Sequence, residues 1–423
     1  MERRARTEKT PVDADVVVVG AGLAGLRCAR ALHEAGRHVV VLEAADHVGG
    51  RVTSENVDGF TVDRGFQVLN PSYPAVRRWV DVDALELGSF DAGVLARTDA
   101  GLRVVADPRR TPSLALDTLR SGLVDVRDLW GLGRWLAPVL ARPQATAAGP
   151  DSTLAEALDD LGMHGDLRRV VERFIAGVVV EPDASTSAQF VRLLMRSFAL
   201  GRPGLPAGGM QRLPEQLAQG LPDVRTGVRV EAVRSGGVDT DGGPLRAQHV
   251  VIAADPPAAA ALGGLPPVPM NGLTTWWFAV PSAPDRRSLV AVDARGSQVP
   301  PGPVWNAAVV TAAAASYAPV GRHLVEATTL LARPDGAADE RAVLAHLGDM
   351  YGCETRGWEV LAHHVIPDAV PASPPPLRLT RPVELGDGLF VCGDHRDTSS
   401  IQGALVSGER AARAVLGAGG PVR

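Results

Sequence analysis

The feature that most constrains the fold is a glycine pattern near the start of the chain, within residues 15–51, "DVVVVGAGLAGLRCARALHEAGRHVVVLEAADHVGGR". The run Val16–Val19 is short and β-branched, which is typical of a strand buried on both faces. Gly20, Gly22 and Gly25 follow with the spacing GxGxxG. The first glycine permits a tight turn, the second lets a phosphate approach the backbone, and the third packs helix against strand. The pattern therefore predicts a nucleotide-binding strand–turn–helix unit.

The residues that follow complete this unit. Helical spacing runs from Leu23 to Ala35, and Gly36 is a helix stop signal. A second strand is expected over residues 38–42, and it ends at Glu43, where a ribose hydroxyl needs an acceptor. An acid at this place disfavours the 2′-phosphate of NADP but does not separate NAD from FAD. A unit of this shape without a nucleotide is the alternative, and it leaves the placement of the acid unexplained.

A second glycine motif comes soon after the acid. Gly49 and Gly50 let the chain pass close to a cofactor, and Arg51 directly behind them can pair with a pyrophosphate in a bidentate manner. The stretch "GFTVDRGFQVLNPSYP" follows at residues 59–74. The alternative for the arginine is an ordinary surface residue, which its position behind the glycine pair disfavours.

The end of the chain carries a third motif, "LFVCGDHRDTSSIQGALVSGERAA" at residues 389–412. We expect a strand that ends at Cys392, a Gly393–Asp394 turn, and a helix with Ser399 or Ser400 as its N-cap. Small residues let this helix pack closely on its neighbours, and they are Gly403, Ala404, Gly408, Ala411 and Ala412. An ordinary closing strand and helix would explain the small residues, but not the distant glycine–glycine–arginine motif.

These motifs together resemble the flavin-containing amine oxidase superfamily, which includes amine oxidases, protoporphyrinogen oxidases and phytoene-desaturase-like proteins. The resemblance implies an α/β fold, with a GR2-type FAD-binding Rossmann-like domain interleaved with a mixed α+β substrate domain. It assigns residues 13–75, 202–255 and 380–418 to the FAD domain, and residues 76–201 and 256–379 to the substrate domain. It covers both ends and a middle segment well, whereas the regions between match only in broad layout.

The resemblance also implies which residues contact FAD. Asp394 would hold the ribityl or pyrophosphate region, and the amides near Ile401 and Gln402 would meet the pyrimidine edge of the flavin. A positive helix end there favours the negative charge of reduced flavin. The backbone of Val230 would meet the adenine, although its side chain can equally be a strand core residue. The expected cofactor-binding residues are Gly20, Gly22, Leu23, Ala24, Gly25, Glu43, Ala44, Gly49, Gly50, Arg51, Gly65, Phe66, Gln67, Val230, Gly393, Asp394, Ser400, Ile401, Gln402 and Ala404.

One compositional bias bears on the chemistry. Lys9 is the only lysine among the 43 basic residues, and it lies upstream of the first predicted strand. Amine oxidases of the superfamily commonly use a lysine that holds a water beside flavin N5, and arginine does not give up its proton readily. An amine oxidase of the usual type is therefore disfavoured. No cysteine of an SGGCY-like motif precedes the closing helix, and Cys392 falls in the strand, so FAD is expected to be non-covalent.

The remaining composition limits partners and location. A net charge of -5 and a pI near 6.1 argue against a nucleic-acid partner. Cys28, Cys353 and Cys392 are widely spaced and form no CxxC pair, which favours a reducing cytoplasm and argues against a disulfide or a metal site. No apolar run reaches the roughly 18 residues of a transmembrane helix. A small organic molecule is the expected partner, and the oligomeric state is left open.

The expected chemistry is carried by the cofactor. FAD takes a hydride at N5, so the protein needs only to position the substrate and tune charge. We predict a desaturase- or oxidase-like FAD-dependent oxidoreductase with an apolar or aromatic organic substrate. His395, Gln67 and Trp358 are the candidate catalytic residues, each with core packing or a structural hydrogen bond as the alternative. A flavin-dependent isomerase, an amine oxidase without the usual lysine, a non-catalytic flavoprotein and an NAD-dependent dehydrogenase are the other hypotheses.

The middle of the chain predicts helices followed by an antiparallel sheet. Helical periodicity marks several pieces of residues 76–200, among them 153–161 and 188–200. Strand-like runs follow at residues 274–280, 289–292, 304–311 and 323–331. Trp276 and Trp277 would face opposite sides of the first of these runs. The Pro- and Ala-rich stretches 142–150, 256–270 and 367–376 are expected to be linkers or crossing points.

Overall fold

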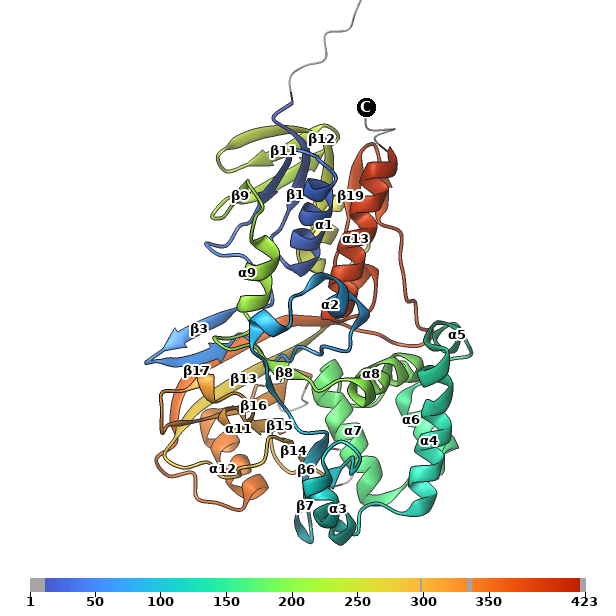
Figure 1. Cartoon of the computed structure of the whole chain (residues 1–423), viewed down its shortest axis with the longest axis vertical. Coiled ribbons are helices and arrows are strands. Elements are labelled where there is room, and N and C mark those ends of the chain that lie inside the picture. Colours follow the sequence, from blue (N-terminus) through green and yellow to red (C-terminus); the bar gives the residue numbers. More distant parts are fainter. Residues whose placement is uncertain (1–11, 297–298, 333–336, 419–423) are drawn as a thin grey trace, which may run out of the picture.

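A computed structural model describes residues 12–296, 299–332 and 337–418, which form two layers, each built on a β-sheet (Figure 1). Within these residues, the sheet of the first layer has eight strands. They are β1 (Ala14–Val19), β2 (Val39–Leu42), β9 (Val224–Arg225), β10 (Val230–Arg234), β11 (Gly237–Thr240), β12 (Gly243–Ile252), β18 (Glu384–Gly386) and β19 (Leu389–Val391).

The centre of the first sheet is parallel and buried. β1 lies between β2 and β12 and pairs parallel with both, and β19 pairs parallel with the far edge of β12. Val16, Val17 and Val18 are fully buried, as expected for a strand covered on both faces. The antiparallel β10–β11 pair extends from the first half of β12.

Helices from distant parts of the chain cover this sheet. They are α1 (Leu23–Glu34), α2 (Pro74–Trp79), α9 (Arg212–Ala218), α10 (Pro256–Gly263) and α13 (Ile401–Ala418). α1 and α13 lie side by side near the described ends of the chain (Figure 1). A Cβ added at Gly408 would lie 2.2 Å from the carbonyl oxygen of Ala24, so the two helices touch through their backbones. The first and last motifs of the sequence therefore meet in space.

The second layer is a mostly antiparallel sheet. Its seven strands among the described residues run in the order β17-β13-β16-β15-β14-β6-β7. Their bounds are β6 (Gly93–Thr98), β7 (Gly101–Ala106), β13 (Met270–Val280), β14 (Val290–Asp293), β15 (Val304–Val309), β16 (His323–Leu330) and β17 (Glu359–Pro371). The helices α11 (Val310–Ala313) and α12 (Glu340–Tyr351) accompany this sheet.

A group of helices stands beside the second sheet, at the lower right of Figure 1. It contains α3 (Ala115–Ser121), α4 (Val126–Ala141), α5 (Pro143–Ala147), α6 (Leu154–Asp160), α7 (Gly165–Val179) and α8 (Ala188–Leu200). Short 3-10 turns occur at Asp83–Leu85, Pro112–Leu114, Ala315–Tyr317 and Asp394–Arg396. The helices predicted at 153–161 and 188–200 are present as α6 and α8.

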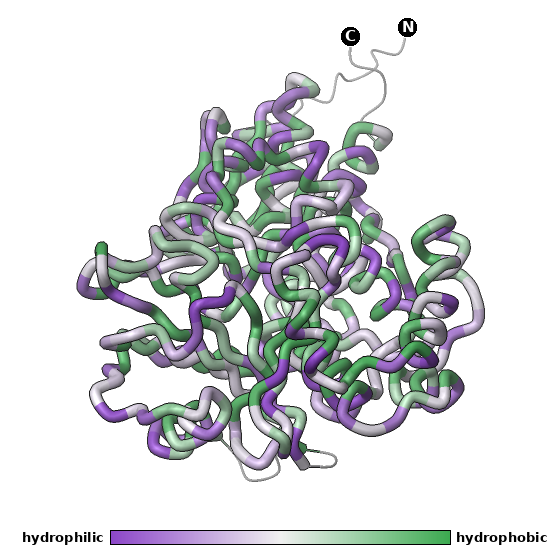
Figure 2. Tube along the Cα trace, turned by 60° about the horizontal axis from the view of Figure 1, so that its bottom comes forward, coloured by the Kyte–Doolittle hydropathy of each residue, from purple (hydrophilic) through white to green (hydrophobic). Residues whose placement is uncertain are grey.

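The two faces of β13 belong to different cores. Trp277 and Ala279 pack in the large cluster that joins the second sheet to the first layer. Trp276 and Phe278 pack on the opposite side with residues of α12. The two tryptophans thus face opposite ways, as their alternation predicts. Green hydrophobic segments run through the interior of both layers in Figure 2, whereas purple segments are commoner at the periphery.

Several elements have no counterpart in the predictions. Helices are predicted in several pieces of residues 76–200, and within the same range β6 and β7 form an unpredicted hairpin that joins the second sheet. Two further pairs were not predicted: β3 (Ser54–Val57) with β4 (Phe60–Asp63), and β5 (Gly88–Ser89) with β8 (Gly204–Leu205). The expected linkers also hold regular structure, because proline fits the first turn of a helix: α5 and α10 begin with proline, and β17 ends at Pro371.

None of the helices in the described ranges combines the length and the apolar character that crossing a membrane requires. Among the same residues, no group of three or more histidine, cysteine, aspartate or glutamate side chains is arranged to hold a metal ion.

Candidate active site

The glycine turn after β1 leaves room beside its backbone. Gly20 has a φ of 107°, which favours glycine, and a Cβ there would lie 2.7 Å from the carbonyl oxygen of Ala253. A Cβ at Gly22 would meet only the carbonyl oxygen of Gly49, at 3.9 Å. A Cβ at Gly25 would strike the carbonyl oxygen of Gly20 at 2.1 Å. The outer glycines hold the turn tightly, and the open side of Gly22 is where a phosphate can approach.

The acid at the end of β2 is held by two backbone groups. One carboxylate oxygen of Glu43 accepts a hydrogen bond from Ala21 N–H at 2.7 Å, and the other from Ala45 N–H at 2.9 Å. The carbonyl oxygen of Glu43 accepts from Val228 N–H at 2.9 Å. Val230, by contrast, pairs with Thr240 in the β10–β11 ladder. The residue whose backbone borders Glu43 is therefore Val228, which the sequence analysis did not single out.

An ion pair joins the second and third motifs. Arg51 Nη2 lies 2.7 Å from Asp394 Oδ1, across 343 positions of sequence. Arg51 Nη1 donates to the carbonyl oxygen of Ala369 at 2.8 Å, and Gln67 Nε2 donates to the carbonyl oxygen of Arg51 at 2.7 Å. The pKa of Arg51 is raised: burial lowers it, but the hydrogen bond and charge of Asp394, together with the charges of Asp255 and Asp368, outweigh the burial. The guanidinium is therefore charged and fixed at the junction of both ends of the chain.

The start of α13 is anchored from both sides. Ser400 Oγ accepts a hydrogen bond from Gly403 N–H at 3.1 Å, which is an N-cap contact. Gln402 Oε1 accepts from Ala75 N–H at 2.8 Å. Ser407 Oγ accepts from Gly393 N–H at 2.9 Å, which ties the Gly-Asp turn to the helix. The N-terminus of α13 is thereby fixed beside the Arg51–Asp394 pair.

His395 lies in the same loop and is neutral. It is 4% exposed, and a Cβ at Gly393 would lie 2.5 Å from its ring, so the imidazole folds back over that glycine. Burial lowers the pKa of His395 to about 4. Neither ring nitrogen has a hydrogen-bond partner among the described residues, and the same holds for Gln67 Oε1. Buried polar atoms are seldom left unpaired, so these atoms indicate a missing ligand or water.

The stretch at residues 59–74 contributes a structural acid, Asp63. Asp63 is fully buried and accepts hydrogen bonds from Ser54 Oγ, Met210 N–H and Tyr317 O–H. Burial raises the pKa of Asp63 to about 6. Tyr317 lies between β15 and β16 of the second layer, so its hydrogen bond to Asp63 joins the two layers.

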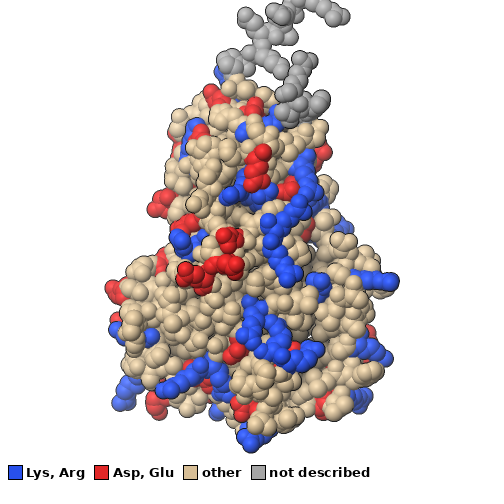
Figure 3. All heavy atoms as spheres, viewed as in Figure 1, with Lys and Arg blue, Asp and Glu red and all other residues tan. Residues whose placement is uncertain are grey.

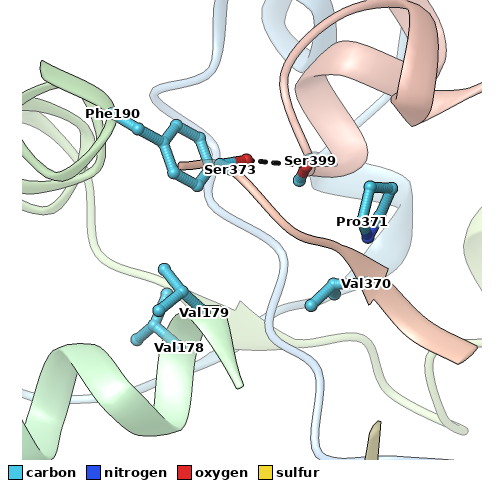
Figure 4. A pocket seen from close by; sticks show the side chains of 7 residues that line it. All are labelled: Val178, Val179, Phe190, Val370, Pro371, Ser373 and Ser399. Carbon is cyan, nitrogen blue, oxygen red and sulfur yellow. Dashed lines mark hydrogen bonds between the residues drawn. The ribbon is translucent and has the colours of Figure 1, made fainter. Parts of the chain in front are cut away.

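A small pocket opens beside the loop that precedes α13 (Figure 4). Its wall is apolar except for Ser373 and Ser399, whose hydroxyl oxygens are 3.0 Å apart. The lining residues come from α7, α8, the end of β17 and the α13 loop, and they are Val178, Val179, Phe190, Val370, Pro371, Ser373 and Ser399. The pocket therefore adjoins the N-terminus of α13.

The face of the second sheet that looks toward the first layer carries an acid that the sequence analysis missed. Glu326 in β16 is 0% exposed, and its neighbours across the strands are Trp277 and Ala308. The only signal in the sequence is a single acidic residue inside the apolar run "HLVEATTL". Such a run predicts a buried strand, but it does not indicate which of the side chains face a cleft.

Trp358 lies away from these residues. It packs against Phe278 with ring centroids 6.0 Å apart, in the core on the far face of the second sheet. His363 stacks on Trp276 on that face, while His364 points the other way toward Glu55. Trp358, a candidate catalytic residue, therefore packs on the opposite side of the second sheet from Trp277.

The outer surface of the first layer has a separate polar groove. Arg27 forms an ion pair with Glu409 at 2.9 Å and stacks over the ring of Trp79. Arg30 and Arg78 line the same groove. Figure 3 shows acidic and basic side chains interspersed over this face of the molecule. The groove lies on the outside of α1, away from the glycine turn.

The predicted cofactor residues can thus be compared with a flavin dinucleotide. The open side of Gly22, the fixed carboxylate of Glu43 and the charged Arg51 suit a phosphate-linked ribose. The N-terminus of α13 and the unpaired atoms of Gln67 and His395 suit a polar ring edge. These groups fit FAD. Leu23, Ala24, Ala44, Gly50, Gly65, Phe66, Ile401 and Ala404 lie in the same segments, whereas Val230 lies in β10.

Known proteins are similar to this chain in sequence and in fold. The profile of the family "Flavin containing amine oxidoreductase" matches residues 23–416. Putrescine oxidase of Kocuria rosea is 29% identical over 313 residues, which are 63% of this chain and 62% of that protein. Flavin-containing amine oxidase A of Sus scrofa is 43% identical over 81 residues, 18% of this chain and 15% of that one. The matches thus span less than two thirds of either relative.

A solved structure supports the fold over almost the whole length. An oxidoreductase from Methanosarcina mazei superposes with a TM-score of 0.70 at 18% identity, covering 94% of this chain and 99% of that one. This likeness confirms the predicted fold class. Because the family profile covers nearly the entire sequence, the protein belongs to the flavin-containing amine oxidoreductase family.

Proposed function

We propose that the protein binds FAD non-covalently and uses it to oxidise a small organic substrate with an apolar or aromatic body. The observation that carries the proposal is the Arg51–Asp394 contact of 2.7 Å. It joins the glycine–glycine–arginine motif to the loop that begins α13, next to the open glycine turn. A dehydrogenase that uses only NAD needs the first motif and has no use for the third.

The residues present suit each part of the dinucleotide. Gly22 would face the pyrophosphate, Glu43 the adenosine ribose and the backbone near Val228 the adenine. Arg51 and Asp394 would hold the middle of the molecule, and the amides at Ile401 and Gln402 the pyrimidine edge. The proposed division of the chain into an FAD domain (13–75, 202–255 and 380–418) and a substrate domain follows from this arrangement.

The cysteines support non-covalent binding. Cys28 and Cys392 are fully buried and contact each other, and burial together with that contact raises the pKa of Cys28. Cys353 follows α12, in the second layer. None of the three lies in the loop between Asp394 and α13. All three are free thiols, which also supports the cytoplasm as the proposed location.

The protein's own residues would position the substrate and stabilise the charge that develops on the flavin. Bound FAD supplies a hydride acceptor at N5. The capped N-terminus of α13 would direct backbone N–H groups toward the negative charge of reduced flavin and so stabilise that charge without reorganisation. The apolar pocket of Val178, Val179 and Phe190 would exclude water from the substrate. His395 would act as a neutral hydrogen-bonding group, because its pKa of about 4 leaves it uncharged near pH 7.

The cofactor assignment is tested on the purified full-length chain. We expect a yellow protein that releases FAD on denaturation, identified by mass spectrometry of the supernatant. Retention of the flavin by the denatured polypeptide would contradict non-covalent binding. A colourless protein that takes up no added FAD would contradict the proposal as a whole.

The oxidation is tested by anaerobic bleaching. Candidate apolar and aromatic alcohols, ketones and hydroaromatic compounds are added to the FAD-loaded protein without oxygen, and the flavin absorbance is followed. Loss of the oxidised spectrum with formation of a product two hydrogens lighter supports oxidation. A product of unchanged mass that forms only after the flavin is reduced would instead support an isomerase.

Amine oxidation is a second candidate, because putrescine oxidase and amine oxidase A are among the relatives. It would have to proceed without the usual lysine, since the sole lysine, Lys9, lies outside the described residues. Anaerobic bleaching by aliphatic or aromatic amines, with release of the aldehyde, would favour this candidate over the first.

A further inference from the structure

A band of polar side chains interrupts the apolar face of the second sheet. The band consists of Thr275 in β13, Asn306 in β15, and Glu326 and Thr328 in β16. They are neighbours, because Thr328 lies opposite both Thr275 and Asn306 in the strand register. Their exposed fractions are 0%, 5%, 0% and 1%. All four project from the same face of the sheet, and Asn306 lies against Gly177 of α7.

Apolar residues flank the polar band at both ends. On one side, Ala279 and Leu324 belong to the core shared with the first layer. On the other side, Leu273 and Leu330 pack with Val370, which lines the small pocket of Figure 4. The polar band therefore lies between the shared core and the pocket.

The polar band also adjoins the flavin loop. Thr275 pairs with His364 of β17, and Ile366 two residues further along faces the same way. A Cβ added at Gly65 would lie 3.2 Å from Ile366 Cδ1. The segment Gly65–Gln67 therefore runs against the strand that borders the polar band.

Three atoms of the polar band lack a partner. Thr328 Oγ1 donates to Glu326 Oε1 at 2.5 Å. Thr275 Oγ1, Asn306 Oδ1 and Glu326 Oε2 have no hydrogen-bond partner within the described ranges. An unpaired buried polar atom costs about 1–3 kcal/mol, so three on one patch are a cost that a ligand or a water would relieve.

The charge state of Glu326 selects the kind of ligand. Its carboxyl forms no ion pair with any described residue, and burial raises its pKa well above the usual value. Burial therefore favours the neutral form of the acid, and the proton of that form sits on Oε2, because Oε1 already accepts from Thr328. A neutral acid is a hydrogen-bond donor.

We propose that the polar band binds an uncharged, oxygen-bearing end of the substrate, and that Glu326 donates a hydrogen bond from Oε2 to a carbonyl or hydroxyl oxygen of that end. Thr275 completes the contact from the neighbouring strand. The assignment rests on the proposed function, since it places the substrate between this sheet and the flavin. It makes Glu326 a residue that selects neutral oxygen compounds over amines.

The first experiment needs no substrate. Infrared difference spectra of the wild type and Glu326→Gln are recorded at pH 7 on FAD-loaded protein. The wild type should show the carbonyl band of a protonated carboxyl group that is absent from the variant. Absence of that band in the wild type means that Glu326 is ionised, which overturns the assignment.

The second experiment compares matched probes by their perturbation of the flavin spectrum. The pairs are cyclohexanone with cyclohexylamine, and acetophenone with 1-phenylethylamine, which share a carbon skeleton and differ in the polar end. We expect each ketone to bind at least tenfold more tightly than its ammonium partner and to shift the carboxyl band. Tighter binding of the ammonium compounds, or no perturbation by either ketone, overturns the assignment.

Variants locate the effect. Glu326→Gln keeps a neutral donor and should retain ketone affinity within about threefold, whereas Glu326→Ala and Thr275→Val should weaken it by tenfold or more. Thr274→Val is the matched control, since Thr274 lies on the opposite face and bonds Thr329. Equal loss in Thr274→Val and Thr275→Val would contradict the assignment. If FAD binds and is bleached by substrate but these variants bind the probes normally, the inference fails while the proposed function stands.

Discussion

Around Gly20 and Gly393, the first layer is put together from main-chain groups in close contact, whereas the polar band of the second layer is put together from side chains on three strands. An added methyl group would meet a backbone carbonyl oxygen at 2.7 Å at Gly20 and at 2.1 Å at Gly25, and the ring of His395 at 2.5 Å at Gly393. In the second region the strands pair with a register shift beside Asn306, and the polar side chains are what set the band apart from its apolar surroundings. The first region is therefore expected to be sensitive to added volume, and the second to a change of polarity or charge.

The sharpest test of this contrast uses one substitution at two places in α13. In Gly408→Ala the new Cβ would lie 2.2 Å from Ala24 O, so α1 and α13 must separate, at a cost of about 3 kcal/mol. Gly417→Ala meets nothing within 4 Å and should leave stability unchanged or raise it by about 0.5 kcal/mol. Urea unfolding measures both. Equal effects of the two substitutions would show that the helices do not touch through their backbones.

Asp63, which joins the two layers, should make the free energy of unfolding depend on pH. Burial raises the pKa of Asp63 to about 6 in the folded protein, compared with its ordinary value of 3.8 in the unfolded chain. The folded state therefore binds the proton more tightly, and its stability is greatest below pH 4 and falls as pH rises to 6. The loss is on the order of 3 kcal/mol. Asp63→Asn should remove this part of the pH dependence, measured as the difference between the two unfolding curves from pH 4 to 7; parallel curves would contradict it.

The ion pair that joins the chain ends should matter more for the cofactor than an exposed pair. Arg51→Met leaves the carboxylate of Asp394, 7% exposed, without its cation, and FAD affinity should fall about thirtyfold, or roughly 2 kcal/mol. Arg212→Met removes an exposed pair with Glu215 and should change affinity less than twofold. Both are measured by equilibrium titration with FAD. A similar affinity in the two variants would separate Arg51 from the cofactor.

The smallest effect is expected on the far face of the second sheet. Trp358→Phe keeps an aromatic ring against Phe278 and should leave FAD affinity and the flavin spectrum unchanged, because this core faces away from the first layer. Trp277→Phe, on the near face, should perturb the spectrum. A change of the flavin spectrum in Trp358→Phe alone would reverse the assignment of faces.

The elements predicted best are those with local signals. The helix expected from Leu23 to Ala35 is observed as Leu23–Glu34, and the closing helix begins after the predicted cap Ser400. Glycine spacing and a capping hydroxyl act within one turn of chain, so a short stretch of sequence suffices. The β6–β7 hairpin lacked such a signal, because its place is set by pairing with β14, almost 200 residues later.

The candidate site divides in the same way. The sequence by itself determined the glycine turn, Glu43, Arg51 and the Gly-Asp turn, because each depends on backbone conformations that few residues allow. Only the tertiary structure decided that Val228 rather than Val230 borders Glu43 and that Trp358 faces away from the first layer. It also decided that Glu326, whose Oε2 has no partner among the described residues, shares a sheet face with Thr275. A strand exposes alternate residues to opposite faces, and which face meets the other layer depends on the packing of segments that the local sequence does not encode.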